Sequence, residues 1–183
     1  IFKGLDTYAD VYLNEKKILA ANNMFREWQV DIKPYLLPDD NKLKVYFHSP
    51  IKMDIPKWDA LPYHYEASND QSENGGVFDK KVSVFARKAG YHYGWDWGPR
   101  LVTSGIWRPV FLEVWNTARI DNVQLIQKNV TAKKAELSTV VEILSDGNIE
   151  NARVILTADG KEYAVKNIKL KPGINTVCLD YVI

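Results

Sequence analysis

Four aromatic side chains surround one aspartate in the stretch YHYGWDWGPR, residues 91–100. Aromatic rings offer large flat apolar surfaces, and a few polar groups among them fix the orientation of a small-molecule ligand. A sugar ring has apolar faces and hydroxyl groups at its edge, so Trp95, Asp96 and Trp97 are candidates for a carbohydrate site. The two glycines that flank them allow the backbone angles of a tight, projecting turn.

The same stretch also fits a purely structural role. In that interpretation both tryptophans belong to a hydrophobic core, and Asp96 caps a turn or pairs with Arg100. The residue types alone leave both interpretations open. They differ in one observable property, because a binding turn exposes its indole rings and its carboxylate, whereas a structural turn buries them.

Other candidates for chemistry carry less information. The dipeptide Asn14–Glu15 resembles the surroundings of the acid/base in many retaining glycosidases, but it follows a strand pattern and is interpreted here as a hairpin turn. Residues 63–66 (YHYE) could reach a ligand, although nothing in their spacing requires it. Cys178 is the only cysteine, and the three histidines lack ligand spacing. We therefore expect neither a disulfide nor a metal site.

Composition narrows the range of partners. The chain has 183 residues, 46% of them hydrophobic, and a formal net charge of +1. Such a balance provides a core but no field for attracting nucleic acid or an anionic membrane. No apolar stretch is long enough to cross a bilayer, and no glycine-rich phosphate loop is present. We expect neither a nucleic-acid nor a membrane partner.

Alternation of apolar and polar residues predicts the elements that position the aromatic stretch. Leu5, Thr7, Ala9, Val11 and Leu13 would face one side of a strand that turns back at 14–17. Further strands are predicted near 18–20, 28–32, 43–47, 82–86 and 106–115. No convincing helical stripe is found. The segment 50–81 is predicted to be irregular, and it is either functional or a solvated insertion.

Beyond residue 117 the strands become short and evenly spaced. Turn signals at Asp159–Gly160 and Pro172–Gly173 predict a second antiparallel sandwich. The expected fold class is all-β, with domains at 1–117 and 118–183. Because the sequence begins and ends within strand patterns, we expect it to be part of a longer protein.

The stretches GLDTYADVYLN, NNMFREW, KVYFHSPI and RKAGYHYGWDWGPRLVTSGIWRPVFLEVW resemble the N-terminal part of β-mannosidases. These enzymes belong to the glycoside hydrolase family that includes β-galactosidase and β-glucuronidase. The resemblance covers about residues 1–120. It implies a jelly-roll, galactose-binding-like sandwich at 1–117 and part of an immunoglobulin-like sandwich at 118–183, followed by a catalytic (β/α)₈ barrel.

The resemblance also implies a function: hydrolysis of terminal β-mannosides with retention. Asp96 would contact hydroxyls of the terminal mannose, with Trp95 or Trp97 as a wall of the subsite. The barrel of the same polypeptide would carry the catalytic glutamates, so this chain alone would hold no catalytic residue, need no cofactor and be inactive. The expected location is periplasmic or secreted in a bacterium, or lysosomal in a eukaryote. The alternatives are a stand-alone carbohydrate-binding module and a purely structural pair of sandwiches.

Overall fold

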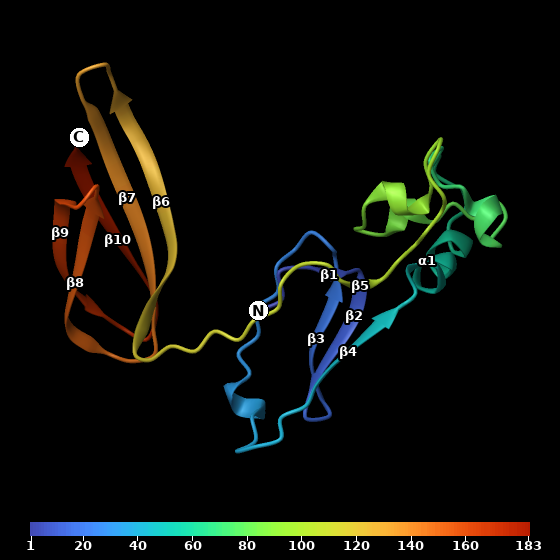
Figure 1. The fold of residues 1–183 in the computed structure, drawn as a ribbon, viewed down its shortest axis with the longest axis horizontal. Coiled ribbons are helices and arrows are strands. Elements are labelled where there is room, and N and C mark those ends of the chain that lie inside the picture. Colours follow the sequence, from blue (N-terminus) through green and yellow to red (C-terminus); the bar gives the residue numbers. More distant parts are fainter. The chain divides into compact units, whose positions relative to one another are not determined.

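The computed structural model describes residues 1–183 and divides them into two compact units, Ile1–Glu113 and Val114–Ile183. Strands make up most of the regular structure (Figure 1), which confirms the predicted all-β class. The first unit contains β1 (Leu5–Asp6), β2 (Tyr8–Leu13), β3 (Lys16–Asn22), β4 (Leu43–His48), helix α1 (Pro50–Asp59) and β5 (Gly105–Ile106). The second contains β6 (Ala118–Val130), β7 (Ala135–Ser145), β8 (Ile149–Ala158), β9 (Lys161–Leu170) and β10 (Gly173–Val182).

The central sheet of the first unit is antiparallel, with the order β3-β2-β4 (Figure 1). All five residues of the predicted apolar set are buried: Leu5, Thr7, Ala9, Val11 and Leu13. Asp6 and Tyr8 of the opposite set are buried too, so the exposure alternates only from Ala9 onward. Three residues of the apolar set pack with Phe2 and Ala21 in one hydrophobic cluster. The short strand β5 pairs with β1.

The hairpin between β2 and β3 turns at Asn14 and Glu15, as predicted. Both residues have positive φ, 49° and 64°, as in a two-residue type I′ turn, whose twist matches that of the flanking strands. The Asn14 side chain donates to the carbonyl of Tyr35 at 2.9 Å and accepts from the backbone N–H of Lys42 at 2.9 Å. The dipeptide therefore closes a hairpin.

Helix α1 corrects the prediction that the whole of 50–81 is irregular. Pro50 lies in the first turn, where the missing N–H would have no helical partner. The Ser49 hydroxyl caps the helix by accepting from the N–H of Lys52. The apolar residues of one helix face, Ile51, Ile55 and Trp58, pack in a second cluster with the buried residues Val82 and Tyr93. The helix thus supports the segment that contains the aromatic stretch.

Three predicted strands of the first unit are wrong or shorter than expected. Around 28–32 there is only an isolated bridge between Trp28 and Phe2. In place of the strand predicted at 82–86, Ser83–Phe85 forms a 3₁₀ helix, and Val82 and Phe85 pack in the second cluster. From 106–115 only β5 and a bridge at Val110 form. Residues 109–111 bond to residues 1–3, and beyond them no neighbouring strand extends the ladder.

In the second unit, strands β10-β7-β6 form one antiparallel sheet and β8-β9 form a hairpin (Figure 1). Both sheets contribute to one core, in which Val141 of β7 and Val177 of β10 contact side chains of β8 and β9. The predicted turns are present, with positive φ at Asp159, Gly160 and Gly173. The immunoglobulin-like assignment of this unit stays a prediction.

Candidate functional site

The aromatic stretch ends in a tight turn at Trp95–Gly98. The N–H of Gly98 donates to the carbonyl of Trp95 at 3.1 Å, and the N–H of Trp95 donates back to the carbonyl of Gly98 at 3.3 Å. Asp96 and Trp97 are the two central residues of this turn. A 3₁₀ helix, Gly90–Tyr93, leads into it.

The turn exposes the three side chains predicted for the site. Trp97 has 84% of its surface exposed and Trp95 has 40%, and Asp96 is exposed as well. The two indole rings meet edge to face, with centroids 5.9 Å apart. Asp96 forms no hydrogen bond or ion pair within the chain. These observations contradict the interpretation in which both tryptophans belong to the core.

Arg100 does not pair with Asp96, contrary to one possibility left open by the sequence. Its Nε donates to Oδ1 of Asp70 at 3.3 Å, and both side chains are almost fully buried. The guanidinium also lies over the ring of Tyr93, 5.6 Å from its centroid. The guanidinium of Arg100 thus pairs with a buried carboxylate, whereas the carboxylate of Asp96 is exposed to solvent.

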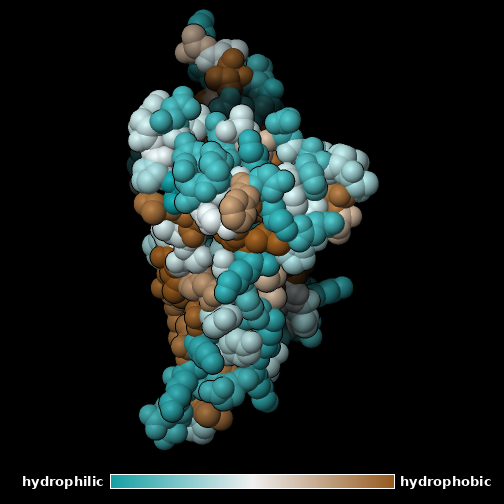
Figure 2. All heavy atoms as spheres, turned by 90° about the vertical axis from the view of Figure 1, so that its right-hand side faces the viewer, coloured by the Kyte–Doolittle hydropathy of each residue, from teal (hydrophilic) through white to brown (hydrophobic).

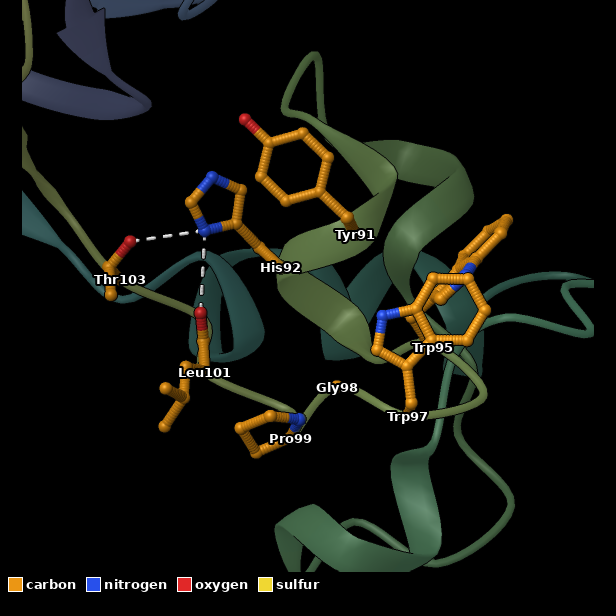
Figure 3. A pocket seen from close by; sticks show the side chains of 8 residues that line it. All are labelled: Tyr91, His92, Trp95, Trp97, Gly98, Pro99, Leu101 and Thr103. Atoms are coloured by element: carbon orange, nitrogen blue, oxygen red, sulfur yellow. Dashed lines mark hydrogen bonds between the residues drawn. The ribbon is translucent and has the colours of Figure 1, made fainter.

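A hollow of about 660 Å³ adjoins the turn (Figure 3). Aromatic and aliphatic groups line most of it, and the lining contains no carboxylate. The lining residues are Tyr91, His92, Trp95, Trp97, Gly98, Pro99, Leu101 and Thr103. An apolar hollow with few polar groups is the usual composition of a small-ligand site. Asp96 is not among the lining residues, but both of its neighbours in the chain, Trp95 and Trp97, are.

Sequence reasoning did not identify His92 and Thr103, the polar groups of this hollow. Nδ1 of His92 lies 3.1 Å from the hydroxyl of Thr103 and 3.4 Å from the carbonyl of Leu101, as Figure 3 shows. The imidazole also stacks on the ring of Tyr91, with centroids 4.8 Å apart. His92 lies within the stretch 91–100. Thr103 lies outside it and carries no sequence signal, because only the folding of the chain places Thr103 next to His92.

A second hollow of about 360 Å³ shares Tyr91, His92 and Thr103 with the first and extends to Asp6 and Trp107. Asp6 is buried there and accepts hydrogen bonds from Lys88 and Thr7. Burial lowers the pKa of the Lys88 ammonium, and the charge of Asp6 opposes this effect. The paired carboxylate is thus a structural element of this wall.

A buried polar cluster around Asp54 lies in the same unit as the site. Asp54 is fully buried and accepts from the Tyr8 hydroxyl at 2.7 Å and from Nζ of Lys57 at 2.6 Å. Burial raises the pKa of the Tyr93 hydroxyl far above its usual range, with further contributions from the charges of Asp54 and Asp70. Tyr93 therefore stays protonated. Its role is to pack beneath the turn.

Exposed apolar side chains are not restricted to this site. On the face drawn in Figure 2, apolar residues reach the surface in patches between polar ones. His64 of the segment 63–66 stacks on Trp58, with centroids 3.8 Å apart, so its ring supports α1.

No three His, Cys, Asp or Glu side chains are grouped so that they could hold a metal ion. None of the helices has the length and hydrophobicity needed to span a bilayer.

Comparison with known proteins gives consistent matches. Residues 1–108 match the family described as glycosyl hydrolase 2 galactose-binding domain-like. The chain is 32% identical to β-mannosidase B of Thermothelomyces thermophilus over its whole length, and 38% identical over 89% of its length to β-mannosidase B of Aspergillus niger. It covers 20% and 19% of these relatives, so it spans about a fifth of their length.

Among solved structures, the β-D-mannosidase from Dictyoglomus thermophilum matches all of this chain with a TM-score of 0.82 and 32% identity, and the match covers 21% of that protein. The resemblance to β-mannosidases stated from the sequence motifs is thereby confirmed. The galactose-binding-like fold of the first unit is confirmed by the family match.

Proposed function

The chain belongs to the glycosyl hydrolase 2 galactose-binding domain-like family, and from this premise we propose that it is an accessory part of a retaining β-mannosidase. In this proposal the Trp95–Gly98 turn contacts the terminal mannose of the substrate. One observation carries it above the others: Asp96 is exposed and unpaired between two exposed indoles, beside an apolar hollow.

The chemistry of the turn suits a hexose. The carboxylate of Asp96 can accept hydrogen bonds from two neighbouring hydroxyls, and hydrogen bonds to a charged group contribute roughly 1.5–3 kcal/mol each. The indoles of Trp95 and Trp97 provide faces for the C–H surfaces of the ring. The hollow can take the group that follows the terminal sugar, with His92 and Thr103 as polar partners.

The bond-breaking step belongs to residues outside this chain. Retaining hydrolysis needs two carboxyl groups about 5–5.5 Å apart, one as nucleophile and one as acid/base. The hollow is lined by no carboxylate, so Asp96 acts as a binding residue. The proposed catalytic pair lies in a barrel of the longer polypeptide, with which this chain would complete the active site.

The test is Asp96→Asn in the longer polypeptide. The amide keeps the shape but removes the charge, so we expect kcat/KM for an aryl β-mannoside to fall by about ten- to a hundredfold, since 1.4 kcal/mol corresponds to about tenfold. The matched control is Asp39→Asn, because Asp39 is also exposed and lies in a separate loop. Equal kinetics of the Asp96 variant and the wild type would refute the role of the turn.

A second candidate function is a stand-alone carbohydrate-binding module. The exposure of Trp97 and Tyr91 on one surface favours it, since binding modules present open aromatic faces. Calorimetry of the 183-residue chain with mannose and manno-oligosaccharides separates the two functions. Binding in the millimolar range or tighter supports the module, whereas no heat supports the accessory role.

A further inference from the structure

Two consecutive residues of the segment 60–81, Asp70 and Gln71, hold the two sides of the Trp95–Gly98 turn. We propose that they are positioning residues that fix the direction in which Asp96 faces its ligand. This inference rests on the proposed function and assigns a role to two residues of the segment 50–81, for which the sequence left a functional role and a solvated insertion as alternatives.

Gln71 holds the entry to the turn. Its backbone N–H donates to the carbonyl of Tyr93 at 2.9 Å, and its side-chain Nε2 donates to the carbonyl of Trp95 at 2.8 Å. Gly94 lies between these two bonds with φ 124°. A Cβ at this position would be 2.7 Å from Cγ of Gln71, so the glutamine side chain packs directly against the backbone of Gly94. Gln71 therefore contacts three successive residues, 93–95, at the entry to the turn.

Asp70 holds the exit. Its Oδ1 accepts from Nε of Arg100, and its Oδ2 accepts from the backbone N–H of Ser83 at 2.9 Å. Both members of the Asp70–Arg100 pair are buried, and removing one member of a buried pair leaves an uncompensated charge. The segment that leaves the turn is thus anchored two residues after Gly98.

The apex has no anchors of its own. Asp96 forms no bond within the chain, and Trp97 contacts the ring of Trp95. The orientation of the carboxylate therefore depends on the two sides of the turn. A preorganised group loses less conformational entropy on binding than a mobile one. Gln71 matters most in this arrangement, since its amide donates to the same Trp95 carbonyl that closes the turn with Gly98.

The first experiment measures amide hydrogen exchange on the 183-residue chain. In Gln71→Glu the side chain keeps its shape but its carboxylate cannot donate to the Trp95 carbonyl. We expect the amides of Trp95 and Gly98 to exchange about tenfold faster, as for the loss of one hydrogen bond. Gln29→Glu is the matched control, because Gln29 is exposed and lies outside the site.

Gln71→Met adds a variant without a change of charge, which retains the packing against Gly94 but has no donor. Faster exchange at both turn amides, with unchanged exchange in β2, supports the proposal for either variant. Unchanged exchange at the turn amides in a folded variant would overturn it. Exchange that rises equally in β2 would also overturn it, because the residue would then support the whole unit.

The second experiment is a double-mutant cycle in the longer polypeptide with an aryl β-mannoside. Gln71→Glu alone should lower kcat/KM about tenfold. If Gln71 acts through Asp96, the variant with both Gln71→Glu and Asp96→Asn is no worse than Asp96→Asn alone. Multiplying losses would overturn the positioning role. A kinetically silent Asp96→Asn would refute the proposed function, while the exchange data would still decide whether Gln71 holds the turn.

Discussion

Single residues within 91–100 have opposite roles despite similar chemistry. Tyr91 and Trp97 are exposed, whereas Tyr93 is fully buried under Arg100. Neither the helix period nor the strand period separates them, because the backbone passes from a 3₁₀ helix to a tight turn within six residues. The sequence could therefore identify the three candidate side chains Trp95, Asp96 and Trp97, while their exposure had to come from the structure.

Tyr93 gives a prediction at this scale. Its hydroxyl is buried without a hydrogen-bond partner, and a buried unsatisfied polar group costs about 1–3 kcal/mol. Tyr93→Phe should therefore leave the free energy of unfolding at pH 7 unchanged or raise it by about 1 kcal/mol, as measured by urea denaturation. A loss of more than about 1 kcal/mol would contradict the absence of a partner.

The same variant should change the response to alkaline pH. Burial raises the pKa of Tyr93 in the folded state above the ordinary tyrosine value of about 10, so above this pH the unfolded chain releases a proton that the folded chain keeps. Stability then falls as pH rises through and beyond about 10. Tyr93→Phe lacks this group and should lose less stability over that range. Parallel pH profiles for the two proteins would contradict the prediction.

At the level of elements, the hairpin between β2 and β3 holds Glu15 in an unfavourable backbone conformation. A residue other than glycine, asparagine or aspartate is disfavoured at φ 64°. Glu15→Gly should raise the free energy of unfolding of the first unit by about 0.5–1 kcal/mol, after allowing for the greater freedom of glycine in the unfolded chain.

The matched substitution is Gly160→Ala in the β8–β9 hairpin, where the φ of Gly160 is 74°. It should destabilise the second unit by about 1 kcal/mol. Thermal denaturation followed by circular dichroism measures both. Opposite signs for the two variants are the expected result, and a destabilising Glu15→Gly would show that the glutamate side chain has a stabilising contact.

Elements that depend on local chemistry were predictable from the sequence. The alternation of β2 and the turns at Asn14 and Asp159 each involve a few neighbouring residues. Helix α1 was not predicted, and its two prolines differ in position. Pro50 lies in the first turn, where proline is well tolerated, whereas Pro56 lies inside the helix, where proline is disfavoured. The role of Asp70 and Gln71 was not predictable, because their side-chain partners lie 13 to 30 residues away in segments without strands or α-helices.

At the level of the whole molecule, the first unit has two hydrophobic clusters and the second has one, and the candidate site lies within the first unit. The first unit thus assembles the turn and its anchors from its own residues. It does not assemble a pair of carboxylates on the hollow. Recognition and bond cleavage are therefore assigned to different parts of the proposed enzyme.

This division predicts that the 183-residue chain does not hydrolyse an aryl β-mannoside. Product release should equal the buffer blank, because retaining hydrolysis needs two carboxyl groups about 5–5.5 Å apart and the hollow beside the Trp95–Gly98 turn is lined by none. The longer polypeptide, assayed in parallel, is the positive control. Hydrolysis by the purified chain that is abolished by Asp96→Asn would contradict the assignment of Asp96 as a binding residue.

The exposure of Trp97 has an optical consequence. An indole in contact with water emits at longer wavelength than one in an apolar interior and is open to quenching by acrylamide. Of the six tryptophans, Trp97 has by far the most accessible ring. A saccharide that covers it would shift the emission to the blue and shield it from the quencher, so the molecule contains its own fluorescent reporter of occupancy.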